Sequence, residues 1–95
     1  MAGVMYSAKS IIIINYTILV ANAWELAASE VNGVRRWMIK ASENTYNPFD
    51  LAFTSAPTTY MSTSGIGFSL DNVDLQPVYV RCATVGTIIE ILYCS

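Results

Sequence analysis

Hydrophobic residues occur in short runs along the chain, and turn-forming residues separate these runs about every ten positions. The runs contain no heptad pattern, no long amphipathic helix and no internal repeat. Short strands at this spacing are typical of a β-sandwich or a barrel. The sequence therefore predicts an all-β fold, a single antiparallel β-sandwich of the jelly-roll or Ig-like kind, with about 7–8 short strands in one domain over residues 1–95.

The first expected strand runs from Ser10 to about Leu19 and is apolar at most positions. Its candidate interface residues are the consecutive Ile11, Ile12, Ile13 and Ile14. Continuous apolar runs are typical of strands buried on both faces, so we expect this strand in the centre of the sandwich or against another chain. Residues 1–14 are a candidate interchain arm or edge strand.

The same stretch has a second interpretation, as a signal peptide. Lys9 precedes the apolar residues 11–20, and residues 21–23 have the small-residue pattern of a cleavage site. The uncharged run from Ser10 to Trp24 is too short to span a bilayer. We favour the strand, because successive isoleucines are β-branched and prefer extended backbone.

Asn32 and Gly33 form the strongest turn signal, because both residue types tolerate the positive φ of a type I′ turn. They predict a hairpin between the flanking segments, with Glu30 opposite Arg35 as an ion pair across the two strands. A competing interpretation makes residues 24–31 a short helix that ends before Gly33.

Residues 34–41 alternate between apolar and polar side chains, as in a half-buried strand. Trp37 and Ile39 are expected in the core, with Arg36 and Lys40 on the outer face. Further short strands are expected at residues 49–53, 60–62 and 66–70.

A second hairpin is expected at the C-terminal end. Residues 78–82 and 87–93 are rich in β-forming side chains, and Val85 and Gly86 lie between them as a turn. This register places Arg81 opposite Glu90, an ion pair that helps to fix the pairing of the two strands.

The amino-acid composition excludes several classes of function. Hydrophobic residues make up 54% of the chain and charged residues 13%, so we expect a folded domain whose surface is partly covered by partners. With five basic residues and a net charge of −2, direct binding to nucleic acid is not expected. The absence of His excludes Ser-His-Asp and Cys-His catalysis and Cys/His zinc sites.

Few residues are candidates for a disulfide, a metal site or a catalytic site. Cys82 and Cys94 are interpreted as small apolar residues without a disulfide, because the expected hairpin sets them too far apart. Asp71 and Asp74 are interpreted as turn residues that bond their own backbone, in preference to a calcium site or a catalytic carboxylate pair. We expect no enzyme activity, no metal and no cofactor.

The aromatic residues offer one further binding hypothesis. Tyr46 and Tyr60 flank turns, where exposed rings form a platform for a sugar or a protein partner. The alternative places the aromatic side chains in the core.

The segments 32–39, 67–75 and 78–93 resemble small virion structural proteins of tailed bacteriophages. In that family a Val-Arg-Ser-x-Thr-x-Gly-Thr-x-x-Glu pattern closes a β-sandwich, and here Cys82 stands where Ser is common. The matched motif belongs to the scaffold, so the resemblance implies structural roles for a set of residues: Asn32, Gly33, Trp37, Arg81, Gly86 and Glu90.

The resemblance implies a non-enzymatic protein located in the virion. We expect a capsid decoration or cement protein that binds the major capsid protein or other virion proteins and forms a homo-oligomer, without membrane or direct nucleic-acid binding. The alternatives are a neck, tail or fibre protein, and a carbohydrate-binding adsorption module.

Overall fold

The computed structural model describes residues 11–94, which form eight strands and one short 3₁₀ helix. The elements are β1 (Ile11–Thr17), β2 (Glu25–Ala28), β3 (Arg36–Ala41), η1 (Glu43–Thr45), β4 (Phe49–Ala52), β5 (Met61–Thr63), β6 (Phe68–Asp71), β7 (Val78–Arg81) and β8 (Ile88–Cys94). The all-β sandwich that the sequence predicts is confirmed for these residues.

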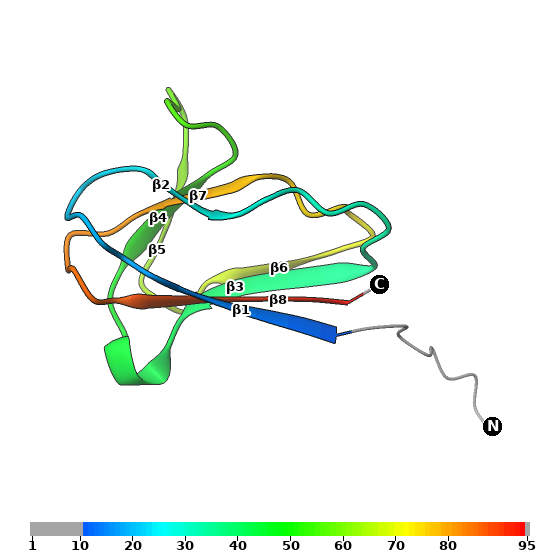
Figure 1. Cartoon of the computed structure of the whole chain (residues 1–95), viewed down its shortest axis with the longest axis horizontal. Coiled ribbons are helices and arrows are strands. Elements are labelled where there is room, and N and C mark those ends of the chain that lie inside the picture. Colours follow the sequence, from blue (N-terminus) through cyan, green and yellow to red (C-terminus); the bar gives the residue numbers. More distant parts are fainter. Residues whose placement is uncertain (1–10, 95) are drawn as a thin grey trace.

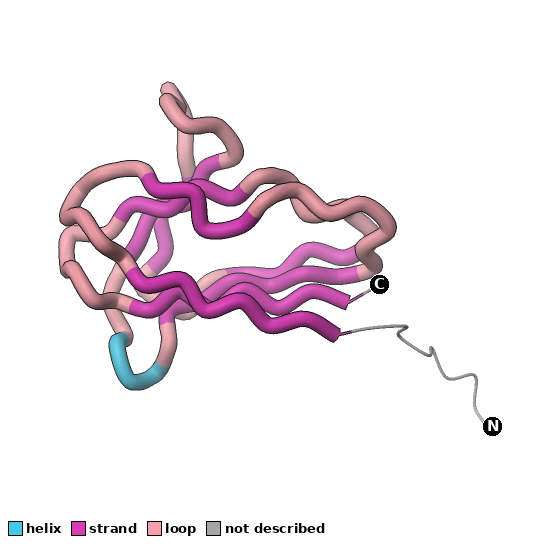
Figure 2. The backbone as a smooth tube through the Cα atoms, in the orientation of Figure 1, coloured by secondary structure: helices cyan, strands magenta, loops and turns pink. Residues whose placement is uncertain are grey.

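The strands form two antiparallel sheets that lie as two layers (Figures 1 and 2). One sheet has the order β1-β8-β3-β6 and the other β2-β7-β4-β5. Since β4 pairs with β5, β3 with β6, β2 with β7 and β1 with β8, the chain is one long hairpin folded over into two layers. Eight strands in this order constitute a jelly roll, which decides between the two sandwich types expected from the sequence.

The core lies between the two sheets and takes alternate residues from the central strands β3, β4, β7 and β8. Trp37 and Ile39 of β3 are buried, as the alternation of residues 34–41 predicts. The other fully or nearly fully buried side chains of the central strands are Ala41, Phe49, Leu51, Val78, Val80, Ile89 and Ile91. These side chains hold the two layers together, because most of the apolar area that folding removes from water lies between them.

The predicted hairpin at Asn32 and Gly33 is wrong, and so is the alternative helix. β2 pairs with β7, whereas β3 lies in the other sheet between β8 and β6. Gly33 does have a positive φ of 76°, but the turn carries the chain from one layer to the other. The flanking residues bond a distant segment, since Val31 bridges Leu75 and the Val34 amide donates to Asp74. Glu30 and Arg35 therefore do not form the expected cross-strand pair.

The predicted C-terminal hairpin is also wrong. Both strands exist, but β7 and β8 lie in different sheets, and the turn that contains Gly86 (φ 89°) crosses between the layers. Arg81 pairs with Asp50 of β4, and Glu90 pairs with Lys40 of β3. The two expected strands are correct and their partners are not, because strands placed in opposite sheets can pack their apolar faces against each other in one core.

β1 confirms a strand at the start of the described chain but contradicts its predicted position in the centre of the sandwich. It is the edge strand of its sheet, with Ile11 63% and Ile13 62% exposed. Ile18, directly after the strand, is the fully buried residue of this stretch. The part of the candidate arm before Ile11 lies outside the described residues.

Candidate interaction surface

The outer face of the β1-β8-β3-β6 sheet carries a continuous group of apolar side chains. The strand register places Ile13, Leu92 and Met38 in one row across three strands. Ile11 lies beside Cys94 in the neighbouring row. We call Ile11, Ile13, Met38, Leu92 and Cys94 the outer apolar band.

Two ion pairs border the outer apolar band. Arg36 forms an ion pair with Asp71 of β6 at one end, and Lys40 lies 3.7 Å from Glu90 at the other. Hydrogen bonding to Arg36 lowers the pKa of the Asp71 carboxyl. An apolar centre between charged pairs is the usual composition of a protein-binding patch, with a dry centre and a polar rim.

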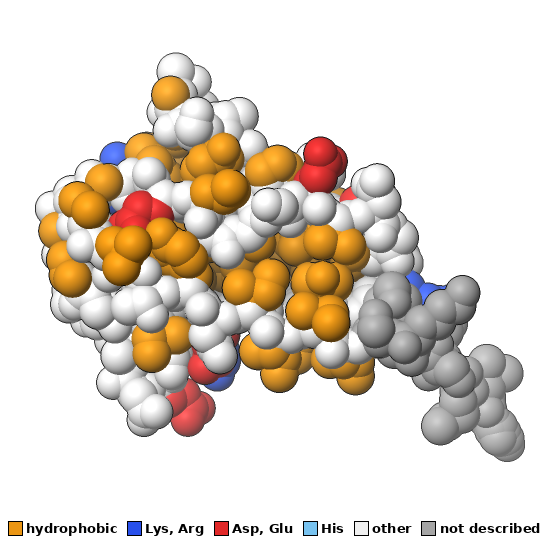
Figure 3. Space-filling model, viewed as in Figure 1, with side chains coloured by type: hydrophobic (Ala, Val, Ile, Leu, Met, Phe, Trp, Pro, Cys, Tyr) orange, Lys and Arg blue, Asp and Glu red, His pale blue; other side chains and the backbone are white. Residues whose placement is uncertain are grey.

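The exposure of the band is unusual for an isolated sheet face. Met38 is 40% exposed in the middle of the sheet, and Leu92 beside it is half-buried. Hydrophobic side chains also gather on the side of the molecule where β1 and β2 lie in front (Figure 3). Contiguous exposed apolar surface of this kind marks an interaction site in a folded protein.

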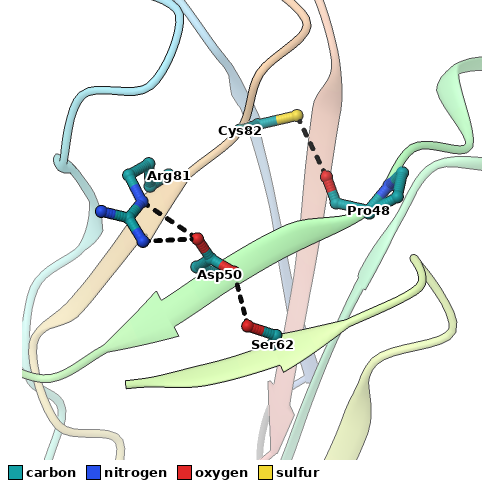
Figure 4. A network of polar contacts seen from close by, with 5 residues as sticks. All are labelled: Pro48, Asp50, Ser62, Arg81 and Cys82. Carbon is teal, nitrogen blue, oxygen red and sulfur yellow. Dashed lines mark hydrogen bonds and ion pairs between the residues drawn. The ribbon is translucent and has the colours of Figure 1, made fainter. Parts of the chain in front are cut away.

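The outer face of the other sheet holds a cluster around Arg81. Its guanidinium donates to Asp50 at 2.8 and 2.9 Å (Figure 4). The guanidinium also lies 4.6 Å from the ring centroids of both Trp24 and Tyr60. Ser62 donates to the other carboxylate oxygen of Asp50 at 2.7 Å. Hydrogen bonds to Asp50 and Tyr60 raise the pKa of Arg81. The cluster joins β4, β5 and β7 through these contacts, and the charge of Arg81 is paired within the chain.

The cysteines lie on different sides of the molecule. The buried Cys82 thiol donates to the carbonyl of Pro48 at 3.3 Å (Figure 4), and Cys94 is half-buried in the outer apolar band. Both are free thiols.

Tyr46 and Tyr60 do not form one platform. Tyr46 precedes β4, and Tyr60 precedes β5, whose Met61 pairs with Leu51 near the far end of β4. The two exposed rings therefore lie at opposite ends of this strand pair. Tyr60 instead packs edge-on against Trp24 at 5.5 Å between centroids, a contact for which the sequence gives no local signal.

Asp71 and Asp74 also have separate roles. Asp71 pairs with Arg36, and Asp74 accepts a hydrogen bond from the Val34 amide at 3.1 Å. The expected turn is present, since Asn72 has a φ of 59°, but the carboxylates bond the segment around β3 and not their own backbone. Among residues 11–94 no group of three or more His, Cys, Asp or Glu side chains comes together as a metal site.

A second polar cluster joins the two layers and has no local signal in the sequence. The Tyr16 hydroxyl of β1 donates to Glu25 of β2 at 2.7 Å, and the amides of Leu19 and Val20 donate to the same carboxylate. Burial would raise the pKa of Glu25, but these three hydrogen bonds outweigh it and lower that pKa. Burial and the Glu25 carboxylate raise the pKa of Tyr16 to about 12.

The Tyr16–Glu25 contact predicts the pH dependence of stability. Because the folded pKa of Tyr16 is raised from 10.0 to about 12, its stabilisation is complete below pH 10 and is lost as the pH rises toward 12. Because the folded pKa of Glu25 is lowered from 4.5, its stabilisation is complete above that pH and is lost as the pH falls through the folded value.

Tyr16→Phe should therefore lower the free energy of unfolding by about 1.5–3 kcal/mol at pH 7, as expected for a hydrogen bond to a charged group. Tyr16→Phe should also reduce the fall in the free energy of unfolding that the wild type shows above pH 10. Urea titrations of the wild type, Tyr16→Phe and Glu25→Gln at pH 4, 7 and 11 measure both effects. If the free energy of unfolding of Tyr16→Phe falls between pH 7 and pH 11 as much as that of the wild type, groups other than Tyr16 cause the fall.

Within residues 11–94 no helix has the length and apolar character needed to cross a membrane. Comparison with known proteins identifies no relative, since no protein-family model, no curated protein and no solved structure matches the chain.

Proposed function

We propose that this chain is a non-enzymatic structural protein of a bacteriophage virion, a capsid decoration or cement protein that binds across shell subunits. The observation that carries the proposal is the outer apolar band, which lies on a regular sheet and whose Ile11, Ile13 and Met38 side chains remain exposed in the single chain. Partners that bury such a band gain about 25 cal/mol per Å² of apolar surface.

Two further features support the proposal. The jelly roll is a recurrent fold of viral capsid proteins, although it also occurs in lectins and cupins, so this support is an analogy of fold. Each ion pair at the ends of the band contains one positive and one negative side chain. A partner that covers the band and part of these pairs therefore buries no unpaired charge. Repetition over a symmetric shell multiplies a modest interface through avidity.

Copy number tests the location in the particle. Mass spectrometry of purified particles should show hundreds of copies per shell for a decoration protein, whereas rings of the neck or tail hold about six or twelve copies. Particles stripped of the protein should lose thermal resistance. Absence of the protein from particles would contradict the proposal.

Substitution of Met38 tests the docking face. Met38→Asp places a charge in the middle of the outer apolar band, and we expect binding to stripped shells to weaken roughly tenfold to a hundredfold, as for loss of one buried Met side chain. Val85→Asp is the matched control, because Val85 is 57% exposed in the turn between β7 and β8, outside the band. Equal binding by both variants would exclude this face as the docking surface.

A further inference from the structure

Among residues 11–94, β1 is an edge strand without any protective feature. Within residues 11–94 it pairs on one side only, with β8. Its seven residues include no charged residue and no proline. Folded proteins normally protect such edges with charges, prolines, bulges or very short strands, because exposed backbone groups pair with other strands.

The other three sheet edges are protected. β5 has only three residues, and β6 has four and ends at the charged Asp71. β2 contains Glu25 and an irregularity in its register between Leu26 and Ala28. β1 is therefore the exception among the edges of the described sandwich.

The register of β1 identifies which backbone groups lie at its free edge. The Ile18 amide donates to the Thr87 carbonyl at 2.9 Å, and in an antiparallel ladder the bonded residues alternate. Ile12, Ile14 and Tyr16 thus direct their N–H and C=O groups toward β8. The residues that direct these groups to the free edge are Ile11, Ile13, Asn15 and Thr17.

We propose that a second copy of this chain adds to β1 as an antiparallel strand, with the two-fold axis at Ile14. In this register Ile11 faces the partner's Thr17, and Ile13 faces the partner's Asn15. All the outward-directed backbone groups of β1 then lie in hydrogen-bonded pairs. On the core-facing side Ile14 faces the partner's Ile14, which is an apolar contact.

The charges near the edge permit this self-pairing. Glu25 is hydrogen-bonded to Tyr16, and Glu90 pairs with Lys40. Pairing of the two β1 strands therefore does not bring these acidic side chains of the two copies together without a bonding partner. The β1-β8-β3-β6 sheet of one copy and the same sheet of the second copy become one eight-stranded sheet. The outer apolar bands of the two copies then lie side by side. The inference does not depend on a virion role, because it concerns the chain alone.

One edge contact buries less surface than a standard interface of about 1,600 Å², so we expect a dissociation constant that is roughly micromolar. Sedimentation of the purified full chain at about 100 times that concentration should show a dimer. A chain that stays monomeric at this concentration would overturn the proposal.

Asn15→Pro tests the edge itself. The Asn15 amide points to the free edge and not to β8, so proline removes a donor for the partner without breaking the β1–β8 ladder. We expect Asn15→Pro to be a folded monomer by sedimentation and circular dichroism, and the matched Asn15→Ala to remain dimeric. A dimer unchanged in Asn15→Pro would place the contact elsewhere and overturn the proposal.

Crosslinking tests the register and remains informative if the proline variant does not fold. In a Cys94→Ser background, Ile14→Cys brings two thiols together at a non-hydrogen-bonded pair, where Cβ atoms are about 4.5–5.5 Å apart. Oxidation should yield a disulfide-linked dimer, and Thr17→Cys in the same background should not. The reverse pattern would exclude the two-fold axis at Ile14.

Discussion

Gly67→Ala is expected to destabilise the sandwich severely. Gly67 lies directly before β6 with a φ of 76°, and an added Cβ would overlap the carbonyl oxygen of Ile39 in β3. The atoms involved are backbone atoms of a central strand, so neither side can move without breaking the β3–β6 ladder. We expect a loss of at least about 4 kcal/mol, which is a large share of the stability of a small domain.

Gly33→Ala is the matched control for this prediction. Gly33 has the same φ of 76°, but no atom lies within 4 Å of the position of its added Cβ. Only the cost of a positive φ at a residue with a Cβ remains, and we expect the free energy of unfolding to fall by about 1 kcal/mol. Urea denaturation followed by circular dichroism measures both variants, and equal losses would show that the contact with Ile39 is not decisive.

Trp37→Ala is expected to have the next largest effect, a loss of about 3–5 kcal/mol. The Trp37 side chain is fully buried between the sheets and packs against Phe53 and Phe68 at 6.1 and 6.0 Å between ring centroids. Alanine would leave a large cavity that the paired strands cannot close, because their register is fixed by the ladders on both sides.

Trp37→Phe separates the packing of the ring from its polar atom. The indole Nε1 is buried and has no hydrogen-bond partner among the described residues, which costs about 1–3 kcal/mol. Phenylalanine removes this donor and part of the ring volume, so the two effects offset each other and we expect a net loss of about 1 kcal/mol or less. Urea titrations of both variants measure the difference, and a loss in Trp37→Phe as large as in Trp37→Ala would mean that Nε1 is satisfied in solution.

The face of each strand follows from the sequence where polar and apolar residues alternate. The pattern of residues 34–41 correctly places Trp37 and Ile39 inside, and it places Arg36 and Lys40 outside. This works because successive side chains of a strand point to opposite faces, a property of the local backbone. β1 lacks the alternation, so its sequence shows a strand but cannot show that the strand lies at an edge.

The candidate site could be predicted only in part. The four isoleucines are recognisable as interface candidates from their apolar character, and two of them, Ile11 and Ile13, belong to the outer apolar band. The band also needs Met38 and Leu92, which lie far from Ile13 in the chain and become its neighbours only through the order β1-β8-β3. No spacing in the sequence encodes that neighbourhood.

An all-β chain, the approximate positions of its strands and the inward face of β3 can be predicted from the amino-acid sequence, because they depend on residue propensity and on a two-residue period. The pairing of the strands cannot be predicted in this way, because it depends on contacts between distant parts of the chain. The turns at Gly33 and Gly86 have positive φ values, but positive φ is compatible with a hairpin and with a crossover alike. The choice of crossover depends on burying the apolar faces of both sheets in one core, and that free energy arises only when distant parts of the chain meet.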